Sequence, residues 1–457
     1  MLARTPSRPY LILLLTLSVI GCEPGATPAT NPEPTAVQDP PAWLDGTVIY
    51  ELFVPDFTEE GTFQAIIPRL PELRALGVNT IWLMPIHPIG EVGRKGVLGS
   101  PYAIRDYYAV NPEYGTEDDF RALVEATHAA DMRLIIDFVA NHTAPDNAWV
   151  ADHPTWYTQD AEGNPIVPAG TDWTDTRELN YDNPALRAEM INVLRHWVET
   201  YNIDGYRCDV AGLVPSSFWA EAIDSLRAVK PVLMLAEHGE VDIHEVGFDL
   251  TYGWPEYSAL KEVWTGAPVS AFTEVVHDVD AALPAGTGRL RFTTNHDETA
   301  WDAPPPALFG GQEGARAAYV LMASLPGVPL VYNGQEVGIE ATVPFFEQTP
   351  YDWSVRPEVQ AFYAQYLEVH AQSNALRRGA LTLLPGSEDV VLFERTVDAE
   401  RVVVAVNVRD APSRVTVPQS LQGAQGQALL AGVTTTLGET LTLPPFGTLV
   451  LDVTPAS

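Results

Sequence analysis

Two kinds of apolar pattern alternate along most of the chain. From Gly46 onward, short apolar runs typical of buried strands are separated by longer segments in which apolar residues recur every three or four positions, as on one face of a helix. The strand-like runs lie at residues 47–54, 78–85, 133–139, 204–210, 231–237, 246–252, 289–295 and 328–333. Eight strand–helix units in succession predict an α/β fold, the closed (β/α)8 or TIM barrel.

Two of the predicted helices carry clear start signals. Thr116 and Asp119 have the spacing of a capping box, ahead of a segment whose apolar residues share one face. Asn183 and Pro184 form a good cap and first-turn pair before a second apolar stripe. We therefore expect helices to begin at these two places.

Two regions do not follow this alternation of strand-like and helix-like segments. Residues 143–182 form a polar, Trp-rich stretch between the third strand and the third helix, which predicts an inserted domain. After about residue 375, runs at 389–396, 401–408, 413–417 and 447–454 alternate as antiparallel strands do. We expect a barrel at 43–374, interrupted by the insertion at 143–182, and a C-terminal antiparallel β-sandwich domain at 375–457.

The first residues of the chain have the pattern of an export signal. A basic start is followed by an apolar run too short to span a bilayer, and the run ends in "VIGC", which resembles the bacterial lipobox. We predict a lipoprotein signal peptide at 1–21, lipidation of Cys22 and a Pro/Thr-rich tether at 22–42. The alternative is an ordinary cleaved signal with an incidental cysteine. The expected location is the outer membrane or cell surface, facing the periplasm or the exterior.

The net charge of the chain limits which classes of molecule it is expected to bind. The chain has 26 basic and 60 acidic residues, a net charge of −34. Such a surface repels nucleic acid and anionic lipid head groups, so we expect no nucleic-acid partner and favour a neutral or cationic one. Cys208 is the only cysteine besides Cys22, so the mature chain is expected to form no internal disulfide. The oligomeric state stays open.

Polar and charged residues gather at the ends of the predicted strands. Arg207 and Asp209 are two apart on one strand, so both side chains point to the same face. Burying such charges is costly, so the pair is either a structural salt bridge or part of an active site. Other residues of this kind are Asp137, His142, Glu237, Asn295, His296 and Asp297. In a TIM barrel these strand ends surround one mouth, where active sites lie, and this placement favours an active site.

Four ordered motifs among these residues resemble the conserved regions of the α-amylase family, glycoside hydrolase family 13. They are "DFVANH" (137–142), "GYRCDVAG" (205–212), "AEHGE" (236–240) and "FTTNHD" (292–297). "GSPYAIRDYYAVNPEYGT" (99–116), "GVPLVYNGQE" (327–336) and "LNYDNP" (179–184) match further family segments. The resemblance covers residues 43–455.

Retaining glycoside cleavage fits these residues. The reaction needs a carboxylate nucleophile and a protonated carboxyl group about 5–5.5 Å apart. Asp209 is the expected nucleophile, and Arg207 on the same face would keep it ionised and aimed. Glu237 follows an apolar strand, which would raise its pKa and suit it to act as general acid and then base. The resemblance implies that Asp297 grips the ring hydroxyls and stabilises the transition state.

The resemblance also implies residues that bind the sugar. His142 and His296 would donate hydrogen bonds to it, and Tyr102 would stack on its apolar face. Asp106, Asp137 and Asn295 are expected to support the site from behind. Four tryptophans are candidates for further glucose platforms or for packing, namely Trp149, Trp156, Trp173 and Trp301.

The chain departs from the family after the nucleophile. Many α-amylases have a Lys-His pair there, which contacts the next sugar and gives a carbonyl to calcium, whereas this chain reads "VAGL". Asn141 matches the family's calcium ligand, but its usual partners are not evident. We expect that no cofactor is required and name no metal ligand, with calcium at Asn141 the alternative.

The sequence thus predicts a retaining α-amylase-type hydrolase that cleaves α-1,4-glucosidic bonds in starch, maltodextrins or related α-glucans. A 4-α-glucanotransferase is the alternative on the same scaffold, because only the acceptor differs in the second step. A non-catalytic carbohydrate-binding protein is the alternative from another class. Such proteins usually lose one of the carboxylates, and all three are present here.

Overall fold

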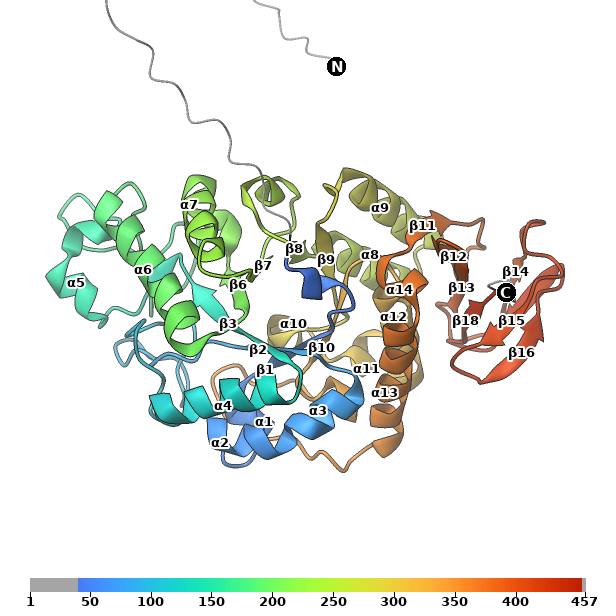
Figure 1. Ribbon diagram of the computed structural model, residues 1–457, viewed down its shortest axis with the longest axis horizontal. Helices are drawn as coiled ribbons and strands as arrows, with labels where there is room; N and C mark the ends of the chain where they lie inside the picture. Colours follow the sequence, from blue (N-terminus) through green and yellow to red (C-terminus); the bar gives the residue numbers. More distant parts are fainter. Residues whose placement is uncertain (1–39, 454–457) are drawn as a thin grey trace, which may run out of the picture. The chain divides into compact units, whose positions relative to one another are not determined.

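A computed structural model describes residues 40–453, and it contains the predicted barrel. Eight parallel strands close in the order β1-β10-β9-β8-β7-β6-β3-β2 (Figure 1). They are β1 (Ile49–Leu52), β2 (Thr80–Leu83), β3 (Arg133–Val139), β6 (Gly205–Asp209), β7 (Leu233–Ala236), β8 (Leu250–Tyr252), β9 (Gly288–Arg291) and β10 (Val328–Tyr332). Each lies within or overlaps one of the predicted runs, so the TIM-barrel prediction is confirmed.

Helices alternate with these strands. The longer ones are α3 (Leu70–Leu76), α4 (Glu117–Ala129), α6 (Pro184–Tyr201), α7 (Ser216–Arg227), α8 (Trp254–Trp264), α9 (Val269–Ala282), α12 (Gly311–Ala323) and α13 (Pro357–Gln372). The short ones are α1 (Val54–Phe57), α2 (Phe63–Ile66), α5 (Ala148–Asp152), α10 (His296–Trp301), α11 (Pro305–Leu308) and α14 (Asn374–Arg378). Both predicted helix starts are confirmed, with a complete capping box at Thr116 and Asp119 and an N-cap at Asn183.

The stretch between β3 and α6 leaves the barrel. Its short strands β4 (His142–Thr143) and β5 (Arg177–Glu178) pair with each other, and α5 lies between them in the chain. The Thr143 hydroxyl contacts the Tyr157 hydroxyl at 2.9 Å, and Leu179 N–H donates to the carbonyl of Asn141 at 3.0 Å. The middle of the insertion and the part near its end are therefore both held against the segment that follows β3.

The C-terminal strands form two sheets. The larger has the order β11-β12-β13-β18-β15-β16, and β14 pairs with β17. Their bounds are β11 (Ala380–Leu383), β12 (Val390–Val397), β13 (Glu400–Asn407), β14 (Ser413–Thr416), β15 (Gln425–Ala428), β16 (Val433–Thr436), β17 (Thr440–Leu443) and β18 (Thr448–Asp452). The expected C-terminal antiparallel domain is confirmed. Residues such as Val391 and Phe393 join the barrel's hydrophobic cluster, whereas Val390 and Leu392 belong to a second cluster on the other side of the sheet.

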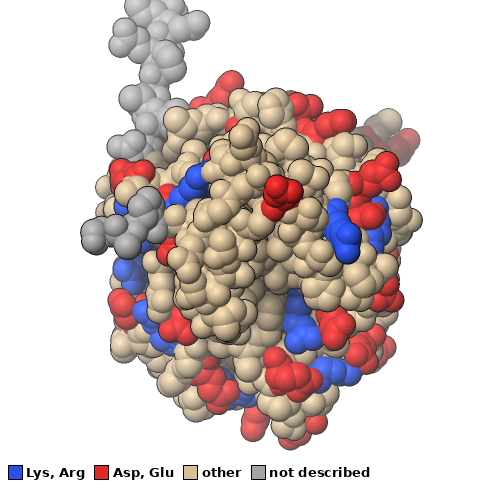
Figure 2. Space-filling view, turned by 90° about the vertical axis from the view of Figure 1, so that its right-hand side faces the viewer, with Lys and Arg blue, Asp and Glu red and all other residues tan. Residues whose placement is uncertain are grey.

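The described residues show mixed surface charges on one face and contain no helix that could cross a membrane. On the face drawn in Figure 2, acidic and basic side chains are interspersed around a wide uncharged area. Between residues 40 and 453, no helix combines the length and apolar character needed to cross a membrane. Cys22, the predicted signal peptide and nearly all of the predicted tether lie outside the described residues.

Candidate active site

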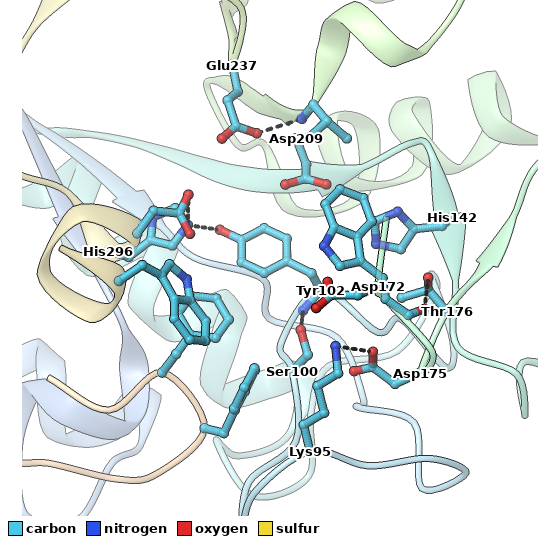
Figure 3. Close-up of a pocket in the computed structure, with 16 residues that line it drawn as sticks. Lys95, Ser100, Tyr102, His142, Asp172, Asp175, Thr176, Asp209, Glu237 and His296 are labelled. Carbon is cyan, nitrogen blue, oxygen red and sulfur yellow. Dashed lines mark hydrogen bonds and ion pairs between the residues drawn. The ribbon is translucent and has the colours of Figure 1, made fainter. Parts of the chain in front are cut away.

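A cavity of about 540 Å³ opens at the C-terminal ends of the barrel strands. Its volume is typical of small-molecule sites. Strand ends contribute Asp209 and Glu237, and α10 contributes His296 and Asp297 (Figure 3). Trp301 at the end of α10 and His142 of β4 also line it. The rest of the lining comes from the loop before α4, the insertion and the segment after β10, and includes Lys95, Tyr102, Trp173, Asp175 and Phe345. Most of the predicted site residues are therefore brought together at one mouth.

The pairing of β6 with β7 places Asp209 beside Glu237. Cys208 pairs with Ala236, so the next residue of each strand lies at the same level. Gly205 begins β6 with φ of +150°, and a Cβ there would lie 2.1 Å from the carbonyl oxygen of Leu233. Only glycine permits this close approach. The local sequence of β6 thus fixes the spacing of two carboxyl groups at its far end.

Arg207 is the centre of the charge network. Its Nη1 donates to Asp137 Oδ1 and to Asp209 Oδ1, both at 2.9 Å. Its Nη2 forms an ion pair with Glu237 Oε2, also at 2.9 Å. The guanidinium is fully buried, and Nε donates to the Tyr252 hydroxyl at 3.1 Å. One cation therefore holds three carboxyl groups from β3, β6 and the end of β7.

Three carboxyl groups around one guanidinium leave an excess of negative charge. Burial raises the pKa of Asp137 to about 6, although Arg207 opposes the shift. Burial likewise raises the pKa of Asp209 and of Glu237 to about 7, again against the effect of Arg207. Neighbouring carboxylates add to these shifts, because like charges disfavour ionisation. The cluster as a unit therefore retains a proton near neutral pH.

Both carboxyl groups at the cavity meet donors on one oxygen. Asp209 Oδ1 accepts a hydrogen bond from Arg207, which favours the ionised form. Glu237 Oε2 forms the ion pair with Arg207 and also accepts the backbone N–H of Val210 at 2.7 Å. Val210 has φ of +36°, a strained conformation for a β-branched residue, and it aims this N–H at Glu237. These contacts fix the positions of both carboxyl groups at the cavity.

Asp137 lies behind the cavity. It is fully buried, and its Oδ2 accepts hydrogen bonds from Trp82 Nε1 at 3.2 Å and from the Tyr102 hydroxyl at 3.1 Å. The Tyr102 hydroxyl also contacts His296 Nε2 at 2.9 Å. Asp137 thereby fixes Arg207 and the ring of Tyr102 together.

His296 is held as a cation by two carboxylates. Its Nδ1 contacts Glu51 of β1, and its Nε2 lies 3.4 Å from Asp297 Oδ2. Burial alone would lower the pKa of His296, but Asp297 and Glu51 more than offset it and raise the pKa to about 9. Both ring nitrogens thus contact protein groups. Glu51, buried and distant in sequence, was not predicted.

Asn295 supports the site through a helix cap. Its Oδ1 accepts the backbone N–H of Glu298 at 2.9 Å and starts α10. The cap places His296 and Asp297 in the first helical turn, at the cavity. Asp297 is the more open of the two, with 36% of its side chain exposed.

His142 lies on the wall formed with the insertion. Its ring is 5.2 Å from that of Trp173, and burial lowers its pKa to about 3, so the imidazole is neutral. The Asn141 side-chain nitrogen lies 3.3 Å from His142 Nδ1. Calcium takes about six to eight oxygen ligands, usually with several carboxylates. Within residues 40–453, no group of three or more Asp, Glu, His or Cys side chains is arranged to hold a metal ion.

Some predicted residues are not at the cavity. Asp106 is exposed, and its Oδ1 accepts the Tyr108 N–H at 2.9 Å, so it caps a local turn and does not support the site. Trp149 and Trp156 pack on each other at 5.1 Å, and neither lines the cavity. These tryptophans are packing residues, whereas Trp173 and Trp301 line the cavity.

Comparison with known proteins agrees with the site. Residues 38–164 and 170–231 match the model of the alpha-amylase catalytic domain. The chain is 28% identical over 417 residues to alpha-amylase MalA of Haloarcula japonica, a match over 86% of this chain and 59% of the relative. The chain thus spans about three fifths of that relative's length.

Solved structures match over nearly their whole length. The maltogenic alpha-amylase AmyB from Thermotoga neapolitana has a TM-score of 0.82 at 29% identity, covering 90% of this chain and 100% of that one. An alpha-amylase from Lactobacillus plantarum has a TM-score of 0.81 at 31% identity, covering 90% and 99%. Barrel and C-terminal sheet are therefore shared with these enzymes.

Proposed function

This chain belongs to the α-amylase family of glycoside hydrolases, and we propose that it cleaves α-1,4-glucosidic bonds in starch, maltodextrins or related α-glucans with retention of configuration. The observation that carries the proposal is the contact of one buried guanidinium with the carboxyl groups of Asp209 and Glu237 at a cavity. Two carboxyl groups on one cation, at the ends of adjacent strands, are close together. Close spacing is the property of retaining enzymes.

In the first step, an Asp209 oxygen attacks the anomeric carbon while the bond to the leaving oxygen breaks. Glu237 transfers its proton to that oxygen, so the shortened chain leaves with a hydroxyl group. The product of this step is a covalent glycosyl-enzyme. Arg207 holds the Asp209 carboxylate in place throughout.

In the second step, the ionised Glu237 takes a proton from a water molecule, and the water oxygen displaces Asp209 from the anomeric carbon. Asp297 and His142 would hold the ring hydroxyls, with Tyr102 against the ring face. His296 Nε2 lies 3.4 Å from Asp297 Oδ2 and so holds that carboxyl group beside the ring. Two inversions leave the α configuration of the sugar unchanged.

Proton NMR during early hydrolysis of maltoheptaose tests this mechanism. The α-anomer of the new reducing end is expected first, with the β-anomer rising only by mutarotation. Initial release of the β-anomer would exclude Asp209 as the nucleophile. Products longer than the substrate would instead identify a 4-α-glucanotransferase, and the absence of any turnover would leave the carbohydrate-binding alternative.

We also propose that the enzyme is exported and held at the membrane through a lipid on Cys22. The supporting observation is the "VIGC" sequence after an apolar run, and Glu23 in place of Asp permits transport to the outer membrane. Several acyl chains would hold the protein firmly. Cys22→Ser is expected to move the protein from the membrane fraction to the soluble fraction. A wild-type protein without acyl mass on its N-terminus would refute the anchor.

A further inference from the structure

Trp301 is an exposed aromatic residue at the edge of the cavity. Its side chain is 65% exposed, and the residue belongs to the cavity lining together with the catalytic groups. An exposed large apolar side chain beside a cavity that contains polar groups is typical of a binding site. Most of the indole surface is therefore free to contact a ligand.

The helix α10 directs Trp301 toward the cavity. Asp297 and Trp301 are four residues apart in this helix, so their side chains lie on the same face. Glu298 of the same helix accepts hydrogen bonds from the Tyr257 hydroxyl at 2.8 Å and from Lys261 Nζ at 3.1 Å, both of α8. These bonds fix α10 to the barrel, and they hold Trp301 beside Asp297.

Aromatic rings connect Trp301 with the place where the sugar is cleaved. The ring of Trp301 lies 5.8 Å from that of Phe345, and the ring of Phe345 is stacked on that of Tyr102 at 5.9 Å. Tyr102 lies next to His296 of α10 (Figure 3) and is the residue proposed above to pack against the cleaved glucose. Tyr102, Phe345 and Trp301 therefore form one aromatic strip, which extends from the cleaved bond to the edge of the cavity.

The chemistry of the aromatic strip suits a further glucose unit of the glucan. The faces of a glucose ring carry C–H groups, which pack on aromatic rings, whereas its hydroxyl groups point outward from the ring edge. Asp297 lies beside Trp301 on α10 and offers acceptors for such hydroxyl groups, with 36% of its side chain exposed. An exposed indole next to an exposed carboxyl group thus matches both kinds of surface on a sugar.

We propose, building on the proposed function, that Trp301 stacks on the ring face of a further glucose unit, outside the one held by the catalytic groups. Phe345 supports the indole on its other side. Only a substrate with several linked glucose units reaches this contact, so Trp301 favours maltodextrins over glucosides with a single sugar. Trp301 binds the substrate and takes no part in the bond cleavage.

Two substrates of different length test this proposal. Maltoheptaose is long enough to reach Trp301, whereas α-glucosyl fluoride has one glucose unit and fills only the place at the catalytic groups. The quantity to compare is the ratio of kcat/KM for maltoheptaose to kcat/KM for the fluoride. In Trp301→Ala this ratio is expected to fall about 10-fold, mainly through a higher KM for maltoheptaose. Trp301→Phe keeps an aromatic ring and should retain most of the ratio.

Asp302→Ala is the matched control. Asp302 directly follows Trp301, is also exposed and lies outside the cavity lining. Its carboxylate pairs with Lys261 Nζ at 2.8 Å, so the substitution changes the end of α10 without removing an aromatic ring. The ratio should stay at the wild-type value. Trp301→Gln takes the place of Trp301→Ala should that variant fail to fold.

Binding to the full-length Asp209→Asn protein measures the same contact without turnover. When Trp301→Ala is added to this protein, calorimetry is expected to show a Kd for maltoheptaose that is about 10-fold higher. Asp302→Ala in the same protein should leave the Kd unchanged.

The outcomes separate this inference from the function on which it rests. An unchanged ratio in Trp301→Ala, including equal losses on both substrates, refutes the contact with a further glucose while the hydrolase function stands. A fall in the ratio that Asp302→Ala reproduces assigns the effect to the position of α10 and also refutes the contact. Without turnover of the fluoride, the Kd comparison alone decides the inference. Without turnover of maltoheptaose, the proposed function itself is contradicted.

Discussion

Of the buried arginines on the barrel strands, Arg207 and Arg291 both contact carboxylates. Arg207 of β6 points toward the mouth of the barrel and holds three carboxyl groups, two of which line a cavity. Arg291 of β9 contacts Glu256 of α8 at 2.5 Å and Asp280 of α9 at 3.1 Å. A buried Arg–carboxylate contact is therefore not by itself a sign of function.

The difference lies in what surrounds each network. Arg291 also donates through Nε to the carbonyl of Pro326 at 2.6 Å, and neither it nor Glu256 lines the cavity. The side chains around it come from helices on the outside of the barrel. Around Arg207, by contrast, Asp209 and Glu237 line the cavity. Access from the cavity therefore identifies the site.

Substitutions in the two networks should differ most in their effect on kcat. Asp209→Asn, Glu237→Gln and Asp297→Asn are each expected to lower kcat on soluble starch by about 1000-fold or more, because each removes a group used in the chemical steps. The melting temperature should stay near that of the wild type. Near-full activity of any one variant would show that its residue has another role.

Breaking the Arg291 network should have the opposite effect. Glu256→Gln leaves a buried guanidinium with one carboxylate fewer and is expected to cost about 3–5 kcal/mol in free energy of unfolding. The kcat/KM of the folded fraction should not change. Denaturant unfolding and initial rates on the same preparations measure both quantities. The double variant Arg291→Met, Glu256→Leu should recover part of the loss, since no charge stays buried.

A variant of Glu51 tests whether the contacts of His296 behind the cavity affect turnover. Glu51→Gln is expected to lower kcat by about 10- to 100-fold through misplacement of His296. The pKa of His296 is raised to about 9 from 6.5, so the cation stabilises the fold fully below pH 6.5 and this contribution is lost as pH rises through 9. The gap in unfolding free energy between wild type and variant should therefore shrink across that range. A gap independent of pH would refute the charged state of His296.

Ionisation of the carboxyl groups around Arg207 should change both kcat/KM and the stability of the fold as pH rises. With the pKa of Glu237 raised to about 7, kcat/KM is expected to fall as pH rises through 7, because the general acid ionises. Raised carboxyl pKa values also stabilise the fold below their ordinary range, a contribution lost as pH rises toward 7. Glu237→Gln should flatten this part of the stability curve.

The smallest effect is expected from removing metal ions. Because Asn141 has no cluster of carboxylates around it, EDTA should change neither the activity nor the melting temperature appreciably. A tightly bound ion would stabilise the fold by mass action. A large fall in melting temperature that calcium reverses would reveal a site built from other oxygen ligands.

The order of the elements could be predicted from the sequence because the signals are local. Apolar runs, caps and strand-end polar residues each depend on a few neighbouring positions, and the barrel rule then places the ends of β3, β6 and β7 at one mouth. Strands β15 and β16 gave no such signal. Their residues are mostly Gln, Gly and Thr with at most one buried position each, so alternation is absent.

Only the tertiary structure decided which residues join the site from a distance. Glu51 and His296 are 245 positions apart, and no local pattern relates Lys95 to Asp175 or to Phe346. The same limit applies to the tryptophans, since Trp149 and Trp173 look alike in sequence but only Trp173 reaches the cavity. Long-range contacts depend on how loops cross the barrel mouth. The spacing of apolar residues along the sequence carries no information about that crossing.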